Sequence, residues 1–399
     1  MVSKLPSPIE RVTVPASFAP SNWFRMEKCA LSVWAEWQGV LPESVKAIVG
    51  RVLHAVREEV IRKNLGGPAH TDAVRVAVDA ARSAQENYLA ASADPIGVSL
   101  VEAYGARRWL QRTLELEAWA RGLPKRSIAM KGPPIATKGP LRGGESTSGD
   151  CFGLGAEPLW NSTALRLRGR PDEVRLTECG EVEVTDYKTG FVIGRDGQIA
   201  PSIATQIQMY LLMAEELTGR QAHGIVQEAN STGVPWNDSL RESTRRRAFE
   251  MGQRFPPHAK LAATEAAAPG VHCSGCRLRP QCSTYLRTVP GWWRNDGEHP
   301  RPLPNDVWGR VSAVDEEQLG IRIHLEDETG RKVIVRGLST DRCLDHVPVG
   351  ATLFLFDLQS TEDALLHGRY IHPRALHERS PGPRWPSARR TRIYIGSNS

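Results

Sequence analysis

The sequence predicts an α/β protein with a helical N-terminal region, a core of strands and helices, and a small β-barrel near its C-terminal end. Apolar residues recur at helical spacing through most of the first 125 residues. Residues 163–178 and 181–190 instead alternate apolar and polar side chains, as adjacent strands do, and residues 202–219 return to helical spacing. Beyond residue 305, short alternating segments follow one another closely, which is typical of a barrel.

The length and the breaks in this pattern predict more than one domain. A chain of 399 residues exceeds the size at which a single core usually stops growing. Segments rich in Gly, Pro and basic residues mark the boundaries. The expected organisation is a first domain over 1–288, with a helical part at 22–122, a basic loop at 123–150 and a core at 157–230, then a linker at 289–304, a barrel at 305–378 and a basic tail at 379–399.

Charge and hydropathy narrow the class of protein. The net charge of +6 is compatible with a polyanionic partner. No apolar run reaches the roughly 18–20 residues that a membrane span needs. Residues 1–21 lack the apolar centre of a secretory signal. We therefore expect a cytoplasmic protein without a membrane partner.

The candidate chemistry begins at the end of the second core strand. Asp186 and Lys188 are two residues apart, so they share one face of the strand, while Tyr187 points to the other. Asp172 lies near the end of the preceding strand, and a hairpin over 173–181 brings it beside Asp186. Paired carboxylates are ligands for Mg²⁺ or Mn²⁺, and a lysine offsets charge developing on a phosphoryl group. The spacing alone is more typical of a surface ion pair.

Three short patterns in order make the metal site the better interpretation. They are Gly-x-x-Asp at 169–172, apolar-x-Asp-x-Lys-Thr-Gly at 184–190, and Gln-x-x-x-Tyr at 206–210. Together, over residues 157–220, they resemble the nuclease core of the RecB/AddB-type PD-(D/E)xK superfamily, which includes the CRISPR-associated RecB-like exonucleases. The resemblance implies a restriction-endonuclease-like core.

The resemblance also implies a metal-binding set. Asp172 and Asp186 would hold Mg²⁺ or Mn²⁺, assisted by the backbone carbonyl of Tyr187. The family adds a histidine from an upstream helix that follows a small-residue turn. His70, after Leu-Gly-Gly-Pro-Ala, matches that context better than His54, which sits within a helix. His70 is therefore the expected third side-chain ligand.

The same resemblance assigns roles to the remaining motif residues. Lys188 would orient or activate the attacking water. Gln206 and Tyr210 lie one helical turn apart and share a face, from which they would contact DNA or support the active-site loop. Helix packing alone also accounts for this pair. Glu157, at the start of the first core strand, is a further assisting carboxylate.

Cysteines cluster near the end of the first domain. Cys273, Cys276 and Cys282 lie within ten residues, and the Cys-x-x-Cys pair can chelate one centre. Zinc, with His272 or another residue as fourth ligand, and an iron–sulfur cluster are both compatible with this spacing. Thiols in a reducing compartment are more often metal ligands than disulfides.

RecB-like nucleases of the AddB and CRISPR types close a 4Fe–4S cluster with one N-terminal and three C-terminal cysteines. The segment around Cys29 resembles that N-terminal part, although Ala30 stands where the family usually has proline. The resemblance therefore implies a 4Fe–4S cluster on Cys29, Cys273, Cys276 and Cys282. Its expected role is a structural staple.

The strands after residue 305 resemble an OB-fold, a common binder of single strands through a basic groove and stacking aromatics. Trp308 and Tyr370 are candidate stacking residues, and Arg310 and Arg336 are candidate phosphate contacts. A structural or protein-docking barrel is the alternative.

We expect a metal-dependent nuclease that hydrolyses DNA phosphodiester bonds, as an exonuclease on single strands or DNA ends, in repair or antiviral defence. A catalytically silent nucleic-acid-binding scaffold and an RNA-directed nuclease are the alternatives. The sequence contains no Gly-x₄-Gly-Lys-[Ser/Thr] motif, so any helicase would be a partner, as would a defence-system component.

Overall fold

The computed structural model of the chain describes residues 3–38, 45–63, 71–90, 99–122, 150–188, 192–194, 196–227, 231–270, 272–273, 276–288, 305–317, 320–326, 330, 332–338, 344, 347–360, 376–377 and 392–396. The expected linker at 289–304, and the expected basic loop except for Asp150, lie outside these ranges. No helix within them is long and apolar enough to cross a membrane. The chain folds into two units. The core unit comprises Thr13–Lys28 and Glu36–Lys260, and the C-terminal unit comprises Met1–Val12, Cys29–Ala35 and Leu261–Ser399.

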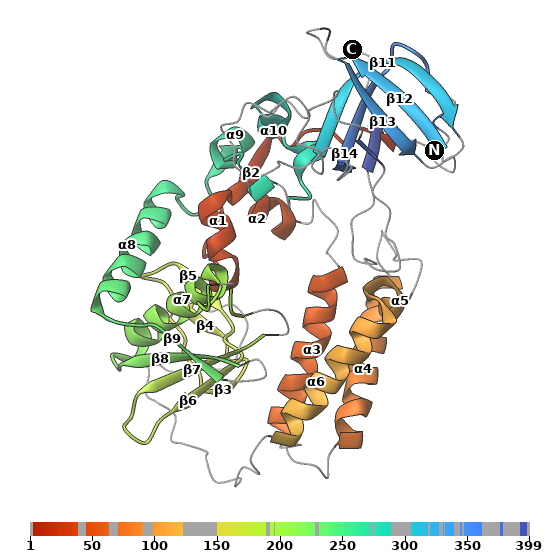
Figure 1. The fold of residues 1–399 in the computed structure, drawn as a ribbon. Coiled ribbons are helices and arrows are strands. Elements are labelled where there is room, and N and C mark those ends of the chain that lie inside the picture. Colours follow the sequence, from red (N-terminus) through yellow and green to blue (C-terminus); the bar gives the residue numbers. More distant parts are fainter. Residues whose placement is uncertain are drawn as a thin grey trace. The chain divides into compact units, whose positions relative to one another are not determined.

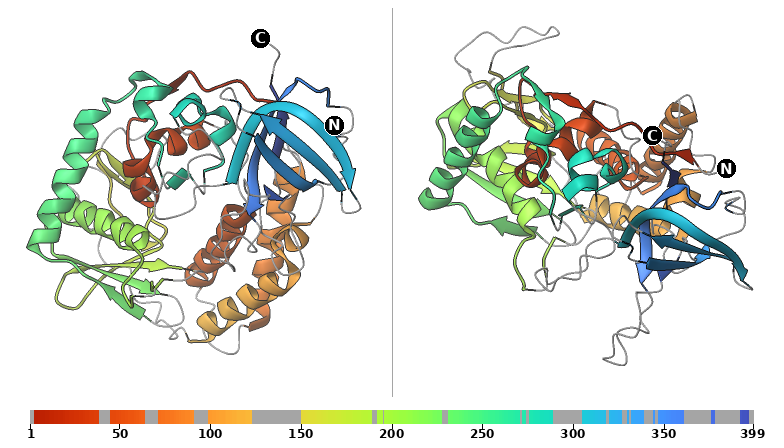
Figure 2. Two further views of the ribbon diagram at one scale, coloured as in Figure 1. Left: turned by 45° about the horizontal axis from the view of Figure 1, so that its top comes forward. Right: turned by 90° about the horizontal axis from the view of Figure 1, so that it is seen from above.

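A helical bundle forms one part of the core unit. It contains α3 (Val45–Arg62), α4 (Thr71–Ala90), α5 (Leu100–Tyr104) and α6 (Ala106–Gly122). Figures 1 and 2 show α3, α4 and α6 side by side. In α3 the apolar side chains of Ile48, Val52, Val56 and Val60 recur every four residues and are buried. This spacing gives the helix one apolar face, which packs against the other helices of the bundle.

The second part of the core unit is a five-stranded sheet in the order β3-β6-β7-β8-β9. Strands β6 and β7 are antiparallel, and β7 and β8 are parallel. The connection from β7 to β8 contains α7 (Pro201–Thr218), which ends at Gly219 in the left-handed conformation. The strands are β3 (Gly155–Ala156), β6 (Glu173–Leu176), β7 (Val182–Tyr187), β8 (Ala222–Gln227) and β9 (Ser231–Val234). Strand β7 is thus a central strand whose carboxyl end carries Asp186 and Tyr187.

Residues 163–178 were expected to form one strand, and that expectation is wrong. They form a turn, then β5 (Leu167–Gly169) paired with β4 (Trp160–Ser162), and then β6. Arg166 explains the turn, since its backbone is left-handed with φ of 53°. Its guanidinium donates hydrogen bonds to the main-chain carbonyls of Pro15, Ala16, Gly252 and Phe255. These contacts fix the turn and place β6, with the preceding Asp172, beside β7.

Short elements complete the core unit. A 3₁₀ turn (Pro20–Asn22) leads into α1 (Trp23–Lys28), which packs on α7. Helix α8 (Asp238–Arg254) is capped by Asn237, whose side chain accepts a hydrogen bond from the backbone N–H of Leu240. Two short strands, β2 (Arg11–Thr13) and β10 (Lys260–Ala262), lie in the sequence where one unit gives way to the other.

The C-terminal unit contains a seven-stranded sheet in the order β1-β16-β14-β11-β12-β13-β15. Strand β15 pairs in parallel with β13 and also pairs with β14. Where the sequence predicted a small barrel, the structure has a sheet in which β14 and β15 make one additional pairing. Residues expected in the basic tail form β16, and the N-terminal β1 joins it. The strands are β1 (Ser3–Lys4), β11 (Asn305–Glu317), β12 (Gly320–Glu326), β13 (Lys332–Leu338), β14 (Thr352–Ser360), β15 (Leu376–His377) and β16 (Arg392–Ile395).

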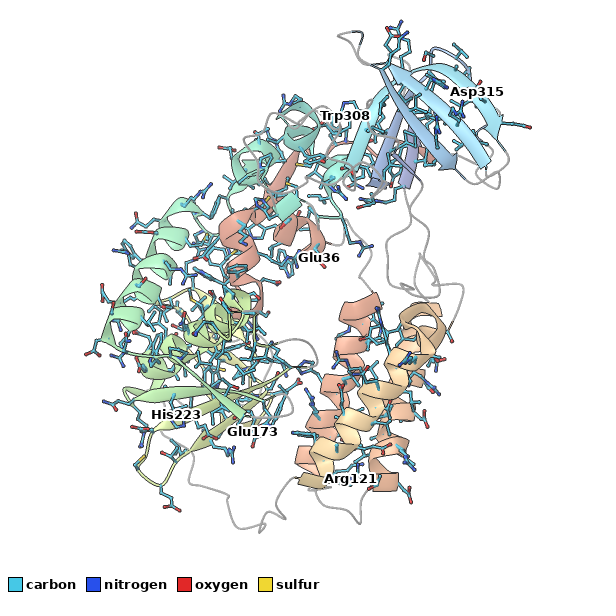
Figure 3. The ribbon with its side chains drawn as sticks, viewed as in Figure 1. Glu36, Arg121, Glu173, His223, Trp308 and Asp315 are labelled. Carbon is cyan, nitrogen blue, oxygen red and sulfur yellow. The ribbon has the colours of Figure 1, made fainter. Side chains whose placement is uncertain are left out.

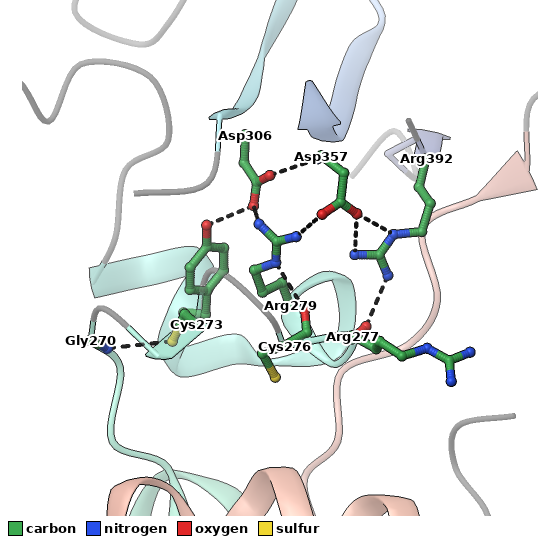
Figure 4. A network of polar contacts seen from close by, with 9 residues as sticks. Gly270, Cys273, Cys276, Arg277, Arg279, Asp306, Asp357 and Arg392 are labelled. Carbon is green, nitrogen blue, oxygen red and sulfur yellow. Dashed lines mark hydrogen bonds and ion pairs between the residues drawn. The ribbon is translucent and has the colours of Figure 1, made fainter. Parts of the chain in front are cut away.

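A buried polar network joins this sheet to the cysteine-rich segment. That segment contains α9 (Ala263–Ala266), a 3₁₀ turn (Arg279–Gln281) and α10 (Ser283–Thr288). Helix α2 (Ala30–Trp37) begins directly after Cys29. Arg279, which is fully buried, pairs with Asp306 at 2.7 Å and with Asp357 (Figure 4). The hydroxyl of Tyr285 donates to Asp306 at 2.7 Å. Arg392 donates to Asp357 at 3.0 Å. The cysteine-rich segment and the sheet therefore form one unit.

Candidate active site

The end of β7 brings Asp186 and Lys188 together. The Nζ of Lys188 lies 2.8 Å from Oδ2 of Asp186, as the shared strand face predicts. Tyr187 points the other way, where its hydroxyl donates to Glu173 and its ring contacts Trp119 at 5.3 Å between centroids. Glu173 marks this part of the sheet in Figure 3. The alternation of side chains along the strand therefore places Asp186 and Lys188 on one face and the ring of Tyr187 on the other.

Gln206 on α7 connects the two members of that pair. Its Nε2 donates to Oδ1 of Asp186 at 2.9 Å, and its Oε1 accepts from Nζ of Lys188 at 3.0 Å. Asp186 is 2% exposed. Burial raises the pKa of Asp186, the charge of Lys188 opposes that shift, and the charge of Asp172 adds to it. Gln206 thus fixes the orientation of both side chains.

Asp172 lies in the turn before β6 and is held from two sides. Its Oδ2 accepts a hydrogen bond of 2.6 Å from the backbone N–H of Tyr187. Its Oδ1 lies 3.3 Å from Nδ1 of His54 on α3. Glu157, just after β3, donates its backbone N–H to the carbonyl of Asp172 at 3.0 Å. The expected closeness of Asp172 to the end of β7 is confirmed. The expected hairpin over 173–181 is wrong, because residues 173–176 form β6 and Asp172 precedes that strand.

His54, Glu157 and Asp172 form the candidate metal site. One ligand atom from each lies within 4.8 Å of the other two. Two carboxylates and an imidazole suit a divalent metal of the Mg²⁺ or Mn²⁺ type. Asp186 is outside this group of three, although its charge acts on both His54 and Asp172. The triad thus contains Asp172 of the expected pair, with Asp186 alongside. Metal binding by Asp186 and by the backbone carbonyl of Tyr187 stays a prediction.

The histidine of the triad is the one that the sequence analysis set aside. His70, the expected ligand, lies outside the described residues. His54 shares α3 with Leu53, Val56 and Val60, which are buried. A histidine inside an otherwise apolar helix face was the available signal, because such a position calls for a polar partner in the core.

His54 gives a test of the triad through pH. Burial acts to lower the pKa of His54, but the hydrogen bond and charge of Asp172 outweigh it and raise the pKa above 6.5. The protonated pair therefore adds stability that is fully present below about pH 6.5 and is lost as the pH rises through the raised value. With EDTA present, the free energy of unfolding of the wild type should exceed that of His54→Gln, and this difference should shrink as the pH rises from about 5 to about 9. An advantage independent of pH in chemical denaturation would contradict the pairing.

Glu157 reaches the site from a strained backbone. Its φ of 45° lies in the left-handed region, which costs a residue with a Cβ roughly 1–2 kcal/mol. Its carboxylate lies 4.0 Å from Nδ1 of His54. Strain of this kind persists where the surrounding structure enforces it, and it concentrates at functional sites.

We therefore expect Glu157→Gly to be more stable than Glu157→Ala by about 1 kcal/mol, the reverse of the usual order of these residues. Both variants should bind divalent metal more weakly than the wild type, because both lose the carboxylate. Thermal unfolding and metal titration measure the two effects separately. An alanine variant as stable as the glycine variant would show that Glu157 is not strained.

Tyr210 holds the turn that carries Asp172. Its ring packs edge-on against Trp160 at 6.1 Å, and its hydroxyl bonds to the backbone of Arg170. Burial raises the pKa of Tyr210, so the phenol stays neutral. A Cβ on Gly169 would lie 2.8 Å from that hydroxyl. Gly169 is thus needed for the close approach, and Tyr210 supports the active-site turn.

The four cysteines lie in the C-terminal unit. Cys29, Cys276 and Cys282 each act electrostatically on Cys273, but no three of these sulfur atoms, all from described residues, lie within 4.8 Å of one another. Burial raises the pKa of Cys273 and Cys282 to about 11. Burial opposes ionisation of Cys29 too, yet hydrogen bonding with His272 lowers its pKa. The thiols are neighbours without forming a tight group.

Main-chain donors face two of these sulfurs. The N–H of Gly270 points to Sγ of Cys273, and the N–H of Tyr285 points to Sγ of Cys282, each at 3.4 Å (Figure 4 shows the first). Donors of this kind stabilise a negatively charged sulfur.

The candidate nucleic-acid residues of the sheet differ in surroundings. Trp308 packs beside Phe354, Phe356 and Tyr285 at centroid distances of 6.2, 6.5 and 6.4 Å, so rings already cover part of it. Arg310 is exposed and Arg336 is half-buried. Tyr370 lies outside the described residues.

Comparison with known proteins supplies the family. No curated protein sequence matches the chain. The family profile of the PD-(D/E)XK nuclease superfamily matches residues 17–283, about two thirds of the chain, and covers the triad, Asp186, Lys188, Gln206 and the cysteine-rich segment. The chain therefore belongs to the PD-(D/E)XK nuclease superfamily.

Proposed function

We propose that this protein is a metal-dependent deoxyribonuclease of the RecB-like type, acting as an exonuclease on single-stranded DNA or DNA ends in repair or antiviral defence. One observation carries the proposal. The His54–Glu157–Asp172 triad lies beside an Asp186–Lys188 pair that Gln206 orients through two hydrogen bonds. A cation site next to a positioned lysine fits hydrolysis of a phosphodiester bond.

The donor set fits a divalent metal. Oδ2 of Asp186 is buried, and Lys188 at 2.8 Å is its one partner in the described part of the chain. A carboxylate oxygen with a single partner keeps one lone pair for a cation. His54, Glu157 and Asp172 would hold the ion, with Asp186 next to it. The ion, when bound, would supply Lewis-acid charge and lower the pKa of a water ligand.

The chain's own residues supply the remaining functions. Lys188 faces the site from the end of β7 and would place a positive charge against the phosphate. Gln206 holds the side chains of Lys188 and Asp186 in place through one hydrogen bond to each. Tyr210 fixes the turn that carries Asp172 through its contacts with Gly169 and Arg170. This network favours a catalytic site over a silent scaffold, since packing alone needs no such set of oriented charges.

We also propose a 4Fe–4S cluster on Cys29, Cys273, Cys276 and Cys282. A zinc ion with Zn–S bonds near 2.3 Å brings its sulfur ligands within about 4 Å of one another. The grouping of ligand atoms within 4.8 Å found among the described residues contains no cysteine. The wider spacing and the N–H donors on two sulfurs support a larger centre that carries negative charge on its thiolates. Such a centre would staple α2 to the segment 273–282.

The C-terminal sheet is proposed as an OB-like module that binds single-stranded DNA. The pairing order β11-β12-β13-β15-β14, with β15 returning to β14, supports a five-stranded, partly open barrel. Val311, Ile323 and Val335 are buried, so the alternate residues, including Arg310 and Arg336, lie on the outward face. The buried Nε of Arg336 has no hydrogen-bond partner in the described part of the chain, which suits an anion.

The module has its own test. Replacing both Arg310 and Arg336 by alanine should weaken binding of a single-stranded oligonucleotide and reduce the slope of log affinity against log salt by about one to two. Cleavage at saturating DNA should continue at the wild-type rate. Unchanged affinity and slope would make the sheet a structural or protein-docking module instead.

The activity itself is tested with 5′- and 3′-labelled single- and double-stranded DNA, and matched RNA, in Mg²⁺, Mn²⁺ or EDTA. Progressive shortening of single-stranded DNA from one end, abolished by EDTA, is the expected result. Preferential loss of RNA would favour the RNA-directed alternative. Binding without cleavage in every metal would favour the scaffold. A helicase or defence-system partner and a cytoplasmic location stay predictions.

A further inference from the structure

Arg57 lies beside the candidate metal site and is absent from every motif described above. It follows His54 on α3 by three residues, so the two share a helix face. Its guanidinium carbon lies 5.2 Å from the ring centroid of Tyr187 and 5.4 Å from that of Trp119. The two rings, which contact each other, hold the cation in place. Arg57 is thus a fixed charge near the end of β7.

The hydrogen bonding of Arg57 is incomplete. The residue is 7% exposed, and its Nε and Nη1 are buried without a hydrogen-bond partner in the described part of the chain. Burying a cation whose donors lack acceptors destabilises a protein. Such a cost is tolerated where a ligand supplies the missing acceptor.

Two other arginines, the half-buried Arg166 and the buried Arg279, have partners for their guanidinium groups. Arg166 uses its guanidinium on four main-chain carbonyls. Arg279 pairs with two aspartates and also donates to the carbonyl of Cys276. The difference lies in the position of Arg57, next to the acidic site.

The nearby carboxylates already have partners. Asp172 binds His54 and the N–H of Tyr187, and Asp186 binds Lys188 and Gln206. Burial lowers the pKa of Arg57, and the charges of Asp172 and Asp186 oppose that shift. An anion from outside the protein is therefore suited to accept hydrogen bonds from Nε and Nη1 of Arg57.

We propose that Arg57 binds a non-bridging oxygen of the substrate phosphodiester and is a further catalytic residue of this site. The proposal rests on the proposed nuclease function. Phosphate oxygens accept strong, charge-assisted hydrogen bonds from a guanidinium. Nε and Nη1 of Arg57 lie on different edges of the group, so either one would donate singly to a phosphate oxygen. In this position it would add positive charge where the phosphoryl group gains negative charge, together with Lys188.

A second consequence concerns metal binding. The positive charge of Arg57 repels a divalent cation at the neighbouring carboxylates, and a bound phosphate neutralises it. Metal and DNA should therefore bind cooperatively in the wild type, and this cooperativity should diminish when Arg57 loses its charge.

The experiment compares Arg57→Met, Arg57→Lys and Arg51→Met with the wild type. Methionine keeps an unbranched apolar chain between the rings, lysine keeps a charge without the fork, and Arg51 is an exposed arginine on the same helix. The single-turnover cleavage rate at saturating DNA, the melting temperature, and the Kd for a single-stranded oligonucleotide in Ca²⁺ are measured for each.

Arg57→Met should lose about 10²–10³-fold in rate and bind the oligonucleotide more weakly, with a melting temperature equal to or above that of the wild type. Arg57→Lys should recover part of the rate, and Arg51→Met should match the wild type. A folded Arg57→Met or Arg57→Lys variant that keeps both wild-type rate and affinity overturns the proposal. If the wild type binds DNA through Arg57 but cleaves nothing, the nuclease function fails while the phosphate site stands; if Arg57 affects neither, the phosphate site fails.

Discussion

Replacing Asp186 by asparagine should abolish metal-dependent cleavage, with a loss of about 10³-fold or more. Asp186 is buried, and Lys188 and Gln206 both contact its carboxylate. Asparagine keeps the shape but removes the negative charge that a divalent ion and Lys188 both need. Losing several kcal/mol of transition-state stabilisation corresponds to a factor of this size. Single-turnover digestion of labelled single-stranded DNA in Mg²⁺ or Mn²⁺ measures it.

Glu183→Gln is the matched control, because Glu183 lies on the same strand but on the opposite face, paired with Arg175 at 2.8 Å. It should cleave at the wild-type rate. Equal activity of the Asp186→Asn variant and the wild type, or wild-type cleavage that survives excess EDTA, would refute the assignment of this site. Similar melting temperatures of the two variants would exclude unfolding as the cause of a lost activity.

Protein purified without oxygen should be brown and carry about four iron atoms per chain, as ligation of a cubane cluster by four cysteines requires. Cys282→Ala should remove the colour and most of the iron, and it should lower solubility. Cys282 is buried beside Tyr285, so the apolar surface around it would open when the staple is lost. Iron content, the visible absorption band and the soluble yield measure these effects.

Cys179→Ala is the matched control, since Cys179 is exposed and lies in the core unit. It should keep both colour and iron. One tightly bound zinc per chain in the colourless wild type would refute the cluster and retain a metal staple. A metal-free wild type that stays folded would refute the staple as well.

Sequence predicted those parts of the site that depend on local pattern. The alternation around Asp186 and the turn at Gly169–Asp172 place their side chains through strand geometry alone. The contact of His54 with Asp172 depends on how α3 packs against the sheet, which no short pattern encodes. Glu157 enters through a left-handed backbone that residues of its type rarely adopt. The missed residues are thus those placed by tertiary packing.

The same distinction holds for the C-terminal sheet. Long alternating strands such as β11 and β12 were predicted from their period of two. Strands β1, β15 and β16 span only a few residues, and pairing with distant strands decides their conformation. Arg57 carried no sequence signal, because a single arginine in an amphipathic helix is ordinary until its partners are known.

The buried network around Arg279 decides where this protein can be cut for expression. A truncation at residue 304 would follow the apparent linker, yet it would strip Arg279 and Tyr285 of Asp306 and Asp357. An unmatched buried arginine of this kind destabilises a protein by about 3–5 kcal/mol. A shortened protein that fails to cleave DNA would then report a damaged cysteine-rich segment, and it would be mistaken for proof that the sheet takes part in catalysis. Point variants on the outward face of the sheet avoid that error.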